Sequence, residues 1–127
     1  MPNPKSIFDL PIAEMLRADV LSERCPSRLI LNHMTSRWGL LALLVLDTGM
    51  HRFSALRRKI GGVSERMLAQ SLQQLEADGL VLRRALDVVP PHVEYTLTPL
   101  GREGAARVRE LTQWVEGNLS QLLTKAA

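Results

Sequence analysis

The stretch that most constrains how this chain can fold is residues 53–80, FSALRRKIGGVSERMLAQSLQQLEADGL. Apolar residues recur every three or four positions as far as Ile60. Gly61-Gly62 then breaks the pattern, and a second amphipathic segment begins after Ser64. Such spacing is typical of helices that bury one face. We therefore predict two helices joined by a tight turn.

Short signals mark the ends of the second helix. Ser64 is a good N-cap, because its hydroxyl can accept a hydrogen bond from an amide of the first turn. Val63 and Leu68 flank it and can pack as a hydrophobic staple, and Gly79 suits the left-handed position after the last turn. A buried leucine stripe should leave the opposite face open. That face comprises Glu65, Arg66, Ala69, Gln70, Gln73 and Gln74.

The chemistry of this open face favours DNA recognition. A glutamine amide can pair bidentately with adenine and an arginine with guanine, and short side chains let a helix sit deep in the major groove. Two helices joined by a glycine turn, the second of which has an outer face rich in amides, are a helix-turn-helix candidate. A plain helical hairpin with a solvated, glutamine-rich face is the alternative that this stretch leaves open.

The excess positive charge is concentrated in the same region. The whole chain carries a net charge of +3. Residues 51–84 hold seven basic and three acidic side chains, residues 1–50 hold five of each, and residues 85–127 hold four basic and five acidic ones. A basic patch confined to one unit is expected of a phosphate-binding surface, although a solvated basic face without a partner has the same composition.

Size and composition exclude several classes of protein. A chain of 127 residues is one domain, and its longest apolar run, residues 40–46, is far shorter than the roughly 18 residues of a membrane span. The first ten residues lack a signal-peptide pattern, so we expect a cytoplasmic protein. Cys25 is the only cysteine, which excludes an internal disulfide and a cysteine-based zinc cluster. No spacing joins His33, His51 and His92 into a catalytic or metal motif, so we expect no enzyme activity, metal or cofactor.

The N-terminal half is predicted to be helical. Residues 1–24 form an arm with a short amphipathic helix around residues 12–20. Pro26 suits the first position of the next helix, which should bury Leu29, Ile30 and Met34. Thr35 or Ser36 then caps a helix that is apolar on every side between residues 38 and 46, so it should lie at the centre of the core.

A β-hairpin is predicted directly after the second helix of the helix-turn-helix. Residues 80–86 and 93–97 read as strands around a turn at residues 87–92, where two prolines cannot pair. A hairpin in this place is a wing, with Arg83 and Arg84 on its first strand and His92 at its tip.

The last helix is predicted to begin at Thr98-Pro99, with Thr98 as N-cap and Pro99 at the first position. An apolar seam follows at three- and four-residue spacing for about 20 Å. Packing against the chain's own domain is one way to bury part of this seam, but its length favours pairing with a second copy of the chain. The seam comprises Val108, Leu111, Trp114, Val115, Leu119 and Leu122.

Taken in order, these motifs resemble the HxlR-type winged-helix transcriptional regulators, a branch of the MarR-like repressors. The resemblance covers residues 25–115, and its most specific part is the wing motif VPPHVEYTLTPLG at residues 89–101. The other matching motifs are Cys25-Pro26, Trp38, RFSALR at residues 52–57, VSERML at residues 63–68 and LQQLEADGL at residues 72–80. Ala55, Gln73 and His92 depart from the residues common in the family.

The resemblance implies a mainly α fold with a small β-hairpin (α+β class). Residues 25–127 would form a winged helix-turn-helix domain with N- and C-terminal dimerisation helices. It also implies a homodimeric, cytoplasmic repressor on a pseudo-palindromic double-stranded DNA operator, with the second helix in the major groove and the wing on the backbone. The expected DNA-binding residues are Arg52, Ser54, Arg57, Ser64, Glu65, Arg66, Gln70, Gln73, Gln74, Arg83, Arg84 and His92.

Cys25 is the candidate site for an effector. Some members of the family sense oxidants or electrophiles through a cysteine at this position, so the resemblance implies an oxidant or a small molecule as effector. Arg24 and Arg28 are cations that would lower the pKa of the thiol, and Glu23 opposes them. A cysteine that only packs is the alternative. For the whole domain, the alternative is a winged-helix module that binds protein rather than DNA.

Overall fold

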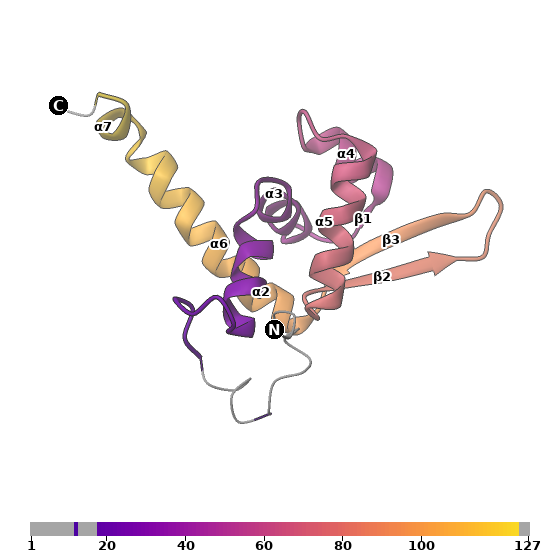
Figure 1. Ribbon diagram of the computed structural model, residues 1–127. Coiled ribbons are helices and arrows are strands. Elements are labelled where there is room, and N and C mark those ends of the chain that lie inside the picture. The colour runs from indigo at the N-terminus through magenta and orange to yellow at the C-terminus, as the bar shows by residue number, and fades with distance from the viewer. Residues whose placement is uncertain (1–11, 13–17, 125–127) are drawn as a thin grey trace.

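The computed structural model describes residue 12 and residues 18–124 (Figure 1). Its helices are α2 (Pro26–Thr35), α3 (Arg37–Leu46), α4 (Phe53–Lys59), α5 (Glu65–Ala77), α6 (Pro99–Gly117) and α7 (Leu119–Thr124). Its strands are β1 (His51–Arg52), β2 (Val81–Leu86) and β3 (His92–Leu97). The predicted mainly α fold with a small antiparallel sheet is confirmed. The helix expected around residues 12–20 lies largely outside the described residues.

Helix α3 is the centre of the core, as its uniformly apolar sequence predicts. Figure 1 shows it between α6 and α5. Its Leu43 is fully buried in a cluster that includes Leu56 of α4 and Leu72 of α5. Burying a leucine side chain stabilises a fold by about 1.5–3 kcal/mol. This cluster therefore fixes the inner face of α5 and, with it, the direction of the outer face.

Side-chain caps begin the helices where the sequence predicts them. The hydroxyl of Ser36, rather than that of Thr35, accepts a hydrogen bond from the Gly39 amide at 3.2 Å and starts α3. At α5 the Ser64 hydroxyl accepts from the Met67 amide at 3.1 Å. Thr98 caps α6 and also donates a hydrogen bond to the Gly79 carbonyl at 2.7 Å. Thr98 thus ties the end of α5 to the start of α6.

The sheet has three strands in the order β1-β3-β2, all antiparallel. The predicted hairpin of β2 and β3 is present, and it extends away from the helices in Figure 1. Strand β1 was not predicted, because two residues are too short to show an alternating pattern. It pairs His51 with Tyr95 and Arg52 with Glu94, and so joins the base of the wing to the start of α4.

Burial along α2 differs from the prediction. Leu29 and Ile30 are exposed, at 40% and 36%, and only Met34 packs against the core. Both side chains lie on a face that the described residues leave partly exposed. The prediction that Leu29 and Ile30 are buried is therefore wrong, because apolar spacing predicts an apolar stripe on a helix but does not show whether that stripe lies in a core or on a surface.

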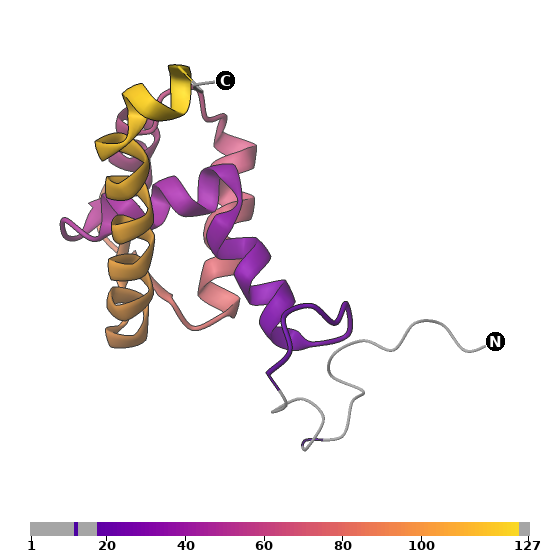
Figure 2. The same cartoon turned by 90° about the vertical axis from the view of Figure 1, so that its left-hand side faces the viewer.

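The C-terminal helix also differs from the prediction. It is not continuous to Leu122: α6 ends at Gly117, and α7 follows in a new direction (Figure 2). The Asn118 side chain donates a hydrogen bond to the Trp114 carbonyl at 2.8 Å. Asparagine side chains compete in this way with the helical backbone, and the preceding glycine weakens the helix further.

No single helix among the described residues is long and apolar enough to cross a membrane. Helices α2 and α3 have the required length and apolar composition only when taken together, and the pair is bent by 73°.

Candidate nucleic-acid interface

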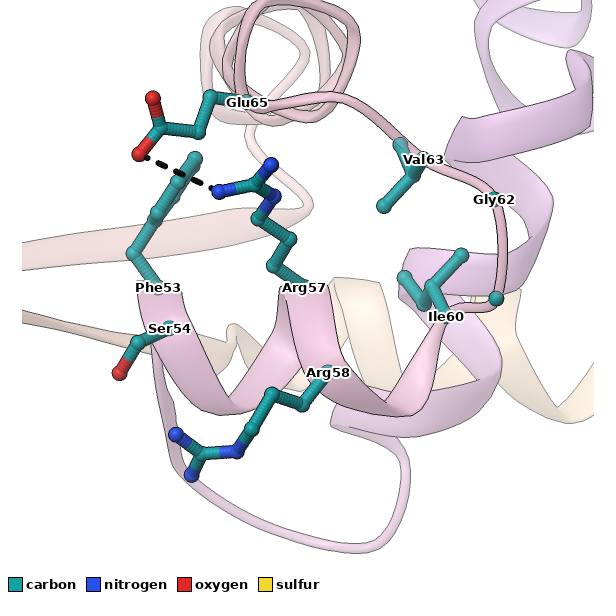
Figure 3. A pocket seen from close by; sticks show the side chains of 9 residues that line it. Phe53, Ser54, Arg57, Arg58, Ile60, Gly62, Val63 and Glu65 are labelled. Atoms are coloured by element: carbon teal, nitrogen blue, oxygen red, sulfur yellow. Dashed lines mark ion pairs between the residues drawn. The ribbon is translucent and has the colours of Figure 1, made fainter.

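The turn between α4 and α5 creates a concave surface on one flank of α5. Gly62 adopts a positive φ of 87°, which a residue without Cβ reaches without strain. The concavity has a volume of about 400 Å³ and is lined by both helices and the turn. Figure 3 shows Arg57 reaching across it toward Glu65, with a nitrogen–oxygen distance of 3.5 Å. Ser54 and Arg58 line the same surface from α4.

The outer face of α5 is open, as predicted. Leu68, Leu72 and Leu75 are buried in the core on the inner face. The exposed members of the expected set are Ser64, Glu65, Arg66, Gln70 and Gln73, whereas Ala69 and Gln74 are half-buried. Each exposed amide and guanidinium is available to a partner that lies along the helix.

Two residues near this face were not among those predicted. Met67 is 43% exposed beside the glutamines, although a methionine in an amphipathic segment reads as part of the buried stripe. Arg37 of α3 lines a concavity on the far flank of α5, together with Trp38. No signal in the sequence would have found Arg37, because only the packing of α3 against α5 brings it there.

The wing places its two arginines on opposite faces. Successive strand residues point to opposite sides of a sheet, so Arg83 and Arg84 cannot contact the same surface. Arg84 pairs in register with Glu94, and Arg52 pairs with Glu94 from the other side. These two guanidinium groups therefore share one face of the sheet with a carboxylate between them.

His92 does not stand at the tip of the wing as predicted. It is the first residue of β3 and pairs with Leu86, so the turn lies beyond it. Its Nε2 is 3.9 Å from the Glu94 carboxylate, and both side chains are about one-fifth exposed. The predicted turn, residues 87–92, is one residue too long, because Pro90 and Pro91 give no sign of the residue at which strand pairing begins again.

His51 anchors the C-terminal end of α4. Its Nε2 accepts a hydrogen bond from the Lys59 ammonium at 2.7 Å, and its Nδ1 donates to the Gly49 carbonyl at 2.8 Å. A lysine ammonium has only donors, so the imidazole accepts through Nε2 and donates through Nδ1. Lys59 is thereby held against the protein beside Arg57 and Arg58.

Cys25 is buried at the N-cap of α2. Its sulfur lies 3.0 Å from the Ser27 hydroxyl and accepts a hydrogen bond from the Asp19 amide at 3.2 Å. The pKa of the Cys25 thiol lies below its ordinary value. The hydrogen bond with Ser27 is the largest cause and the hydrogen bond from the Asp19 amide is the next, whereas burial raises the pKa. The sequence left the balance between Arg24, Arg28 and Glu23 open, and the causes of the lowered pKa are hydrogen bonds that it does not reveal. The Arg28 guanidinium donates a hydrogen bond to the Leu21 carbonyl at 3.4 Å.

A hydrogen bond joins α2 to the end of α5. His33 Nδ1 lies 2.7 Å from the carboxylate of Asp78, the C-cap residue of α5. Both side chains are largely buried. The helix that begins at Cys25 is thus in contact with the helix that carries the open face.

Five of the six expected dimerisation residues lie on an apolar surface that the described residues leave exposed. Only Val108 is buried. Leu111, Val115 and Trp114 are 48%, 38% and 58% exposed on the part of α6 that projects from the core, and α7 adds exposed leucines (Figures 1 and 2). These leucines are Leu119 and Leu122, both in the expected set, and Leu123.

No group of three or more metal-binding side chains occurs in the part of the chain that the structure describes.

The sequence and the fold were compared with known proteins. Residues 33–122 match the model of the HxlR-like helix-turn-helix family. The chain is 57% identical over 110 residues to YtfH of Escherichia coli, an uncharacterised HTH-type transcriptional regulator, and the match covers 87% of each protein.

Two solved structures agree with this assignment. That of ytfH from Salmonella typhimurium superimposes with a TM-score of 0.82 at 57% identity, over 85% of this chain and 96% of the other. The redox regulator HypR in its reduced form gives a TM-score of 0.69 at 36% identity, over 78% and 98% of the two chains. Sequence and structure lead to the same conclusion: the chain belongs to the HxlR-like helix-turn-helix family.

Proposed function

We propose that this protein is a transcriptional regulator that binds a specific double-stranded DNA operator through α5. The observation that carries the proposal is the outer face of α5, which is exposed, rich in amides and guanidinium groups, and fixed in direction by the buried leucines behind it. The protein acts as a repressor in the cytoplasm and has no enzymatic role. Its relatives' designation as HTH-type transcriptional regulators supports this class of function.

Bases are read by the central side chains of this face. Arg66, Gln70 and Gln73 project from one side of α5 at three- and four-residue spacing, and each has the donors or acceptors for a bidentate pair with a base edge. Glu65 and Gln74 lie at the margins of the face. Ser64 keeps its hydroxyl in the cap of α5 and supports the helix that reads the bases.

Phosphates are held by the arginines around α5. Arg57 lies on the α4 flank, and Arg52 and Arg84 lie together on one face of the wing. Phosphate contacts fix the register of a protein on DNA without reading its sequence. Ser54 contributes from α4, and His92 contributes from the face of the wing that carries Arg52 and Arg84, whereas Arg83 lies on the opposite face and does not join this set.

The regulator acts as a homodimer. The uncovered apolar side chains of α6 and α7 support this, together with those of α2, since an exposed patch of this kind marks an interaction surface. Twofold symmetry requires both copies of α5 to meet the same side of the duplex. The operator is therefore a pseudo-palindrome with half-sites about 10 bp apart, or a multiple of that distance.

An oxidant or electrophile acts on the regulator through Cys25. Hydrogen bonds that lower the pKa of this thiol favour the reactive thiolate, and HypR is a redox regulator of similar fold. A modified Cys25 would disturb the start of α2, which is linked to α5 by the bond between His33 and Asp78. A second copy's Cys25 or a small thiol can serve as the disulfide partner, because the chain has no other cysteine.

The decisive experiment selects duplexes bound by the purified protein from a random pool and sequences them. We expect a pseudo-palindrome whose affinity falls steeply with salt and exceeds that for either single strand. An unenriched pool, or binding that does not respond to salt, would contradict the proposal and favour the protein-binding module instead.

A further inference from the structure

Arg37 and Trp38 form a second flank beside α5. They come from the first turn of α3 and line a concavity of about 310 Å³ whose other wall is Met67, Gln70 and Gln74 of α5. The concavity that contains Arg57 includes Glu65. Residues of a helix are about 100° apart, so Glu65 and Gln74 lie on opposite sides of α5. The recognition helix therefore stands between two hollows, each of which carries an arginine.

We propose that Arg37 binds a DNA phosphate on the strand across the major groove from the phosphate that Arg57 contacts. This inference rests on the proposed function. An α-helix with its side chains is about 10–12 Å wide, and the major groove of B-DNA is about 12 Å wide. A helix in the groove thus has one row of phosphates along each flank, and each of the two hollows provides room for one of these rows.

The guanidinium of Arg37 is held in place before DNA arrives. Its Cζ lies 5.4 Å from the centre of the Trp38 ring, a distance at which the ring face attracts a cation. Trp38 is half-buried and its ring reaches the turn of the helix-turn-helix, where a Cβ on Gly62 would lie 3.7 Å from it. Less side-chain freedom is therefore lost when Arg37 binds a phosphate.

The charge of Arg37 is available to a phosphate. None of the ion pairs among the described residues includes Arg37, whereas Arg57 has the Glu65 carboxylate at 3.5 Å. A guanidinium stays protonated in proteins, so Arg37 presents a full positive charge at the rim of the hollow. It is a positioning residue: with Arg57 it fixes the rotation and depth of α5 in the groove, and it reads no base.

The test measures DNA affinity and salt dependence for the unmutated protein and three variants: Arg37→Gln, Arg37→Lys and Arg102→Gln. The last removes an exposed arginine of α6 and is the matched control. We expect Arg37→Gln to weaken binding to the selected operator and to an unrelated duplex by the same factor, roughly tenfold. The slope of log K against log salt should fall by about 0.9 per protomer. Arg37→Lys keeps the charge and should keep the slope, and Arg102→Gln should change neither quantity.

Phosphate ethylation interference then identifies the strand. In each half-site, Arg37→Gln should abolish the effect of ethylation at a phosphate on one strand, and Arg57→Gln should abolish it on the strand across the groove. An unchanged slope in a folded Arg37→Gln variant would overturn the inference, and so would interference lost at the same phosphate in both variants. If Arg37→Gln fails to fold, the interference pattern of the unmutated protein decides, and the absence of interference on the strand across the groove from the Arg57 phosphate would overturn the inference as well. Failure of the unmutated protein to bind any duplex would instead overturn the proposed function.

Discussion

Replacing Leu111 and Val115 by aspartate should convert the protein into folded monomers. Both side chains lie on the projecting part of α6, at 48% and 38% exposure. Because they contribute little to the core of one chain, the substitution should leave the fold of the single chain intact. It should act on the contact between two copies.

The magnitude follows from these exposures. Full burial of a leucine or valine side chain contributes about 1.5–3 kcal/mol, so covering the exposed half of each contributes about 1 kcal/mol. A twofold interface contains four such side chains, which gives about 4 kcal/mol, or roughly three orders of magnitude in the dimer dissociation constant. Carboxylates left unpaired in the interface would weaken the dimer further.

Sedimentation velocity at micromolar concentration measures the outcome directly. The unmutated protein should sediment as a dimer and the double variant as a monomer with an unchanged circular dichroism spectrum and strongly reduced operator affinity. Gln113→Asp is the matched control, because Gln113 lies on the opposite face of α6 and should leave the dimer intact. A monomeric unmutated protein would refute the assembly, and a dimeric double variant would refute this interface.

Three further predictions concern the wing, the thiol and the core. Arg84→Gln should weaken binding to all sequences alike and lower the salt slope by about 1 per protomer in a titration; loss confined to one sequence would contradict this. Ser27→Ala removes the hydrogen bond that lowers the pKa of Cys25 most, so the pKa should rise and less thiolate should be present at pH 7–8. Alkylation by iodoacetamide should therefore slow at pH 7–8, and the midpoint of its pH dependence should move to higher pH. Thr98→Val removes a helix cap and the bond to the Gly79 carbonyl, which should cost about 2 kcal/mol in chemical denaturation; a cost near zero would show that Thr98 does not tie α5 to α6.

Much of the helix-turn-helix could be predicted because its signals are local. Ser64 and Thr98 cap helices through their own hydroxyls, and Gly79 takes the positive φ of 81° expected at a helix end. The leucines of α5 are buried because their spacing fits one face of a helix. Features of this kind depend only on residues that are neighbours in the sequence.

The remaining features depend on contacts between distant parts of the chain or on a second molecule. Strand β1 exists only through its pairing with β3, and Arg37 reaches the flank of α5 only through the packing of α3. Leu29 and Ile30 form an apolar surface that the described residues leave partly exposed. Hydrophobic spacing is the same for a core and for an interface, so the sequence could not assign that stripe.

The base preferences of Gln70→Ala show whether the outer face of α5 reads bases. Affinities of the unmutated protein and the variant would be measured at one salt concentration for the selected operator and for each of its single base-pair substitutions. We expect the variant to lose about 1–3 kcal/mol of discrimination at one base pair in each half-site and to keep its preferences elsewhere. Unchanged preferences at every position, or an equal loss at all of them, would contradict this expectation.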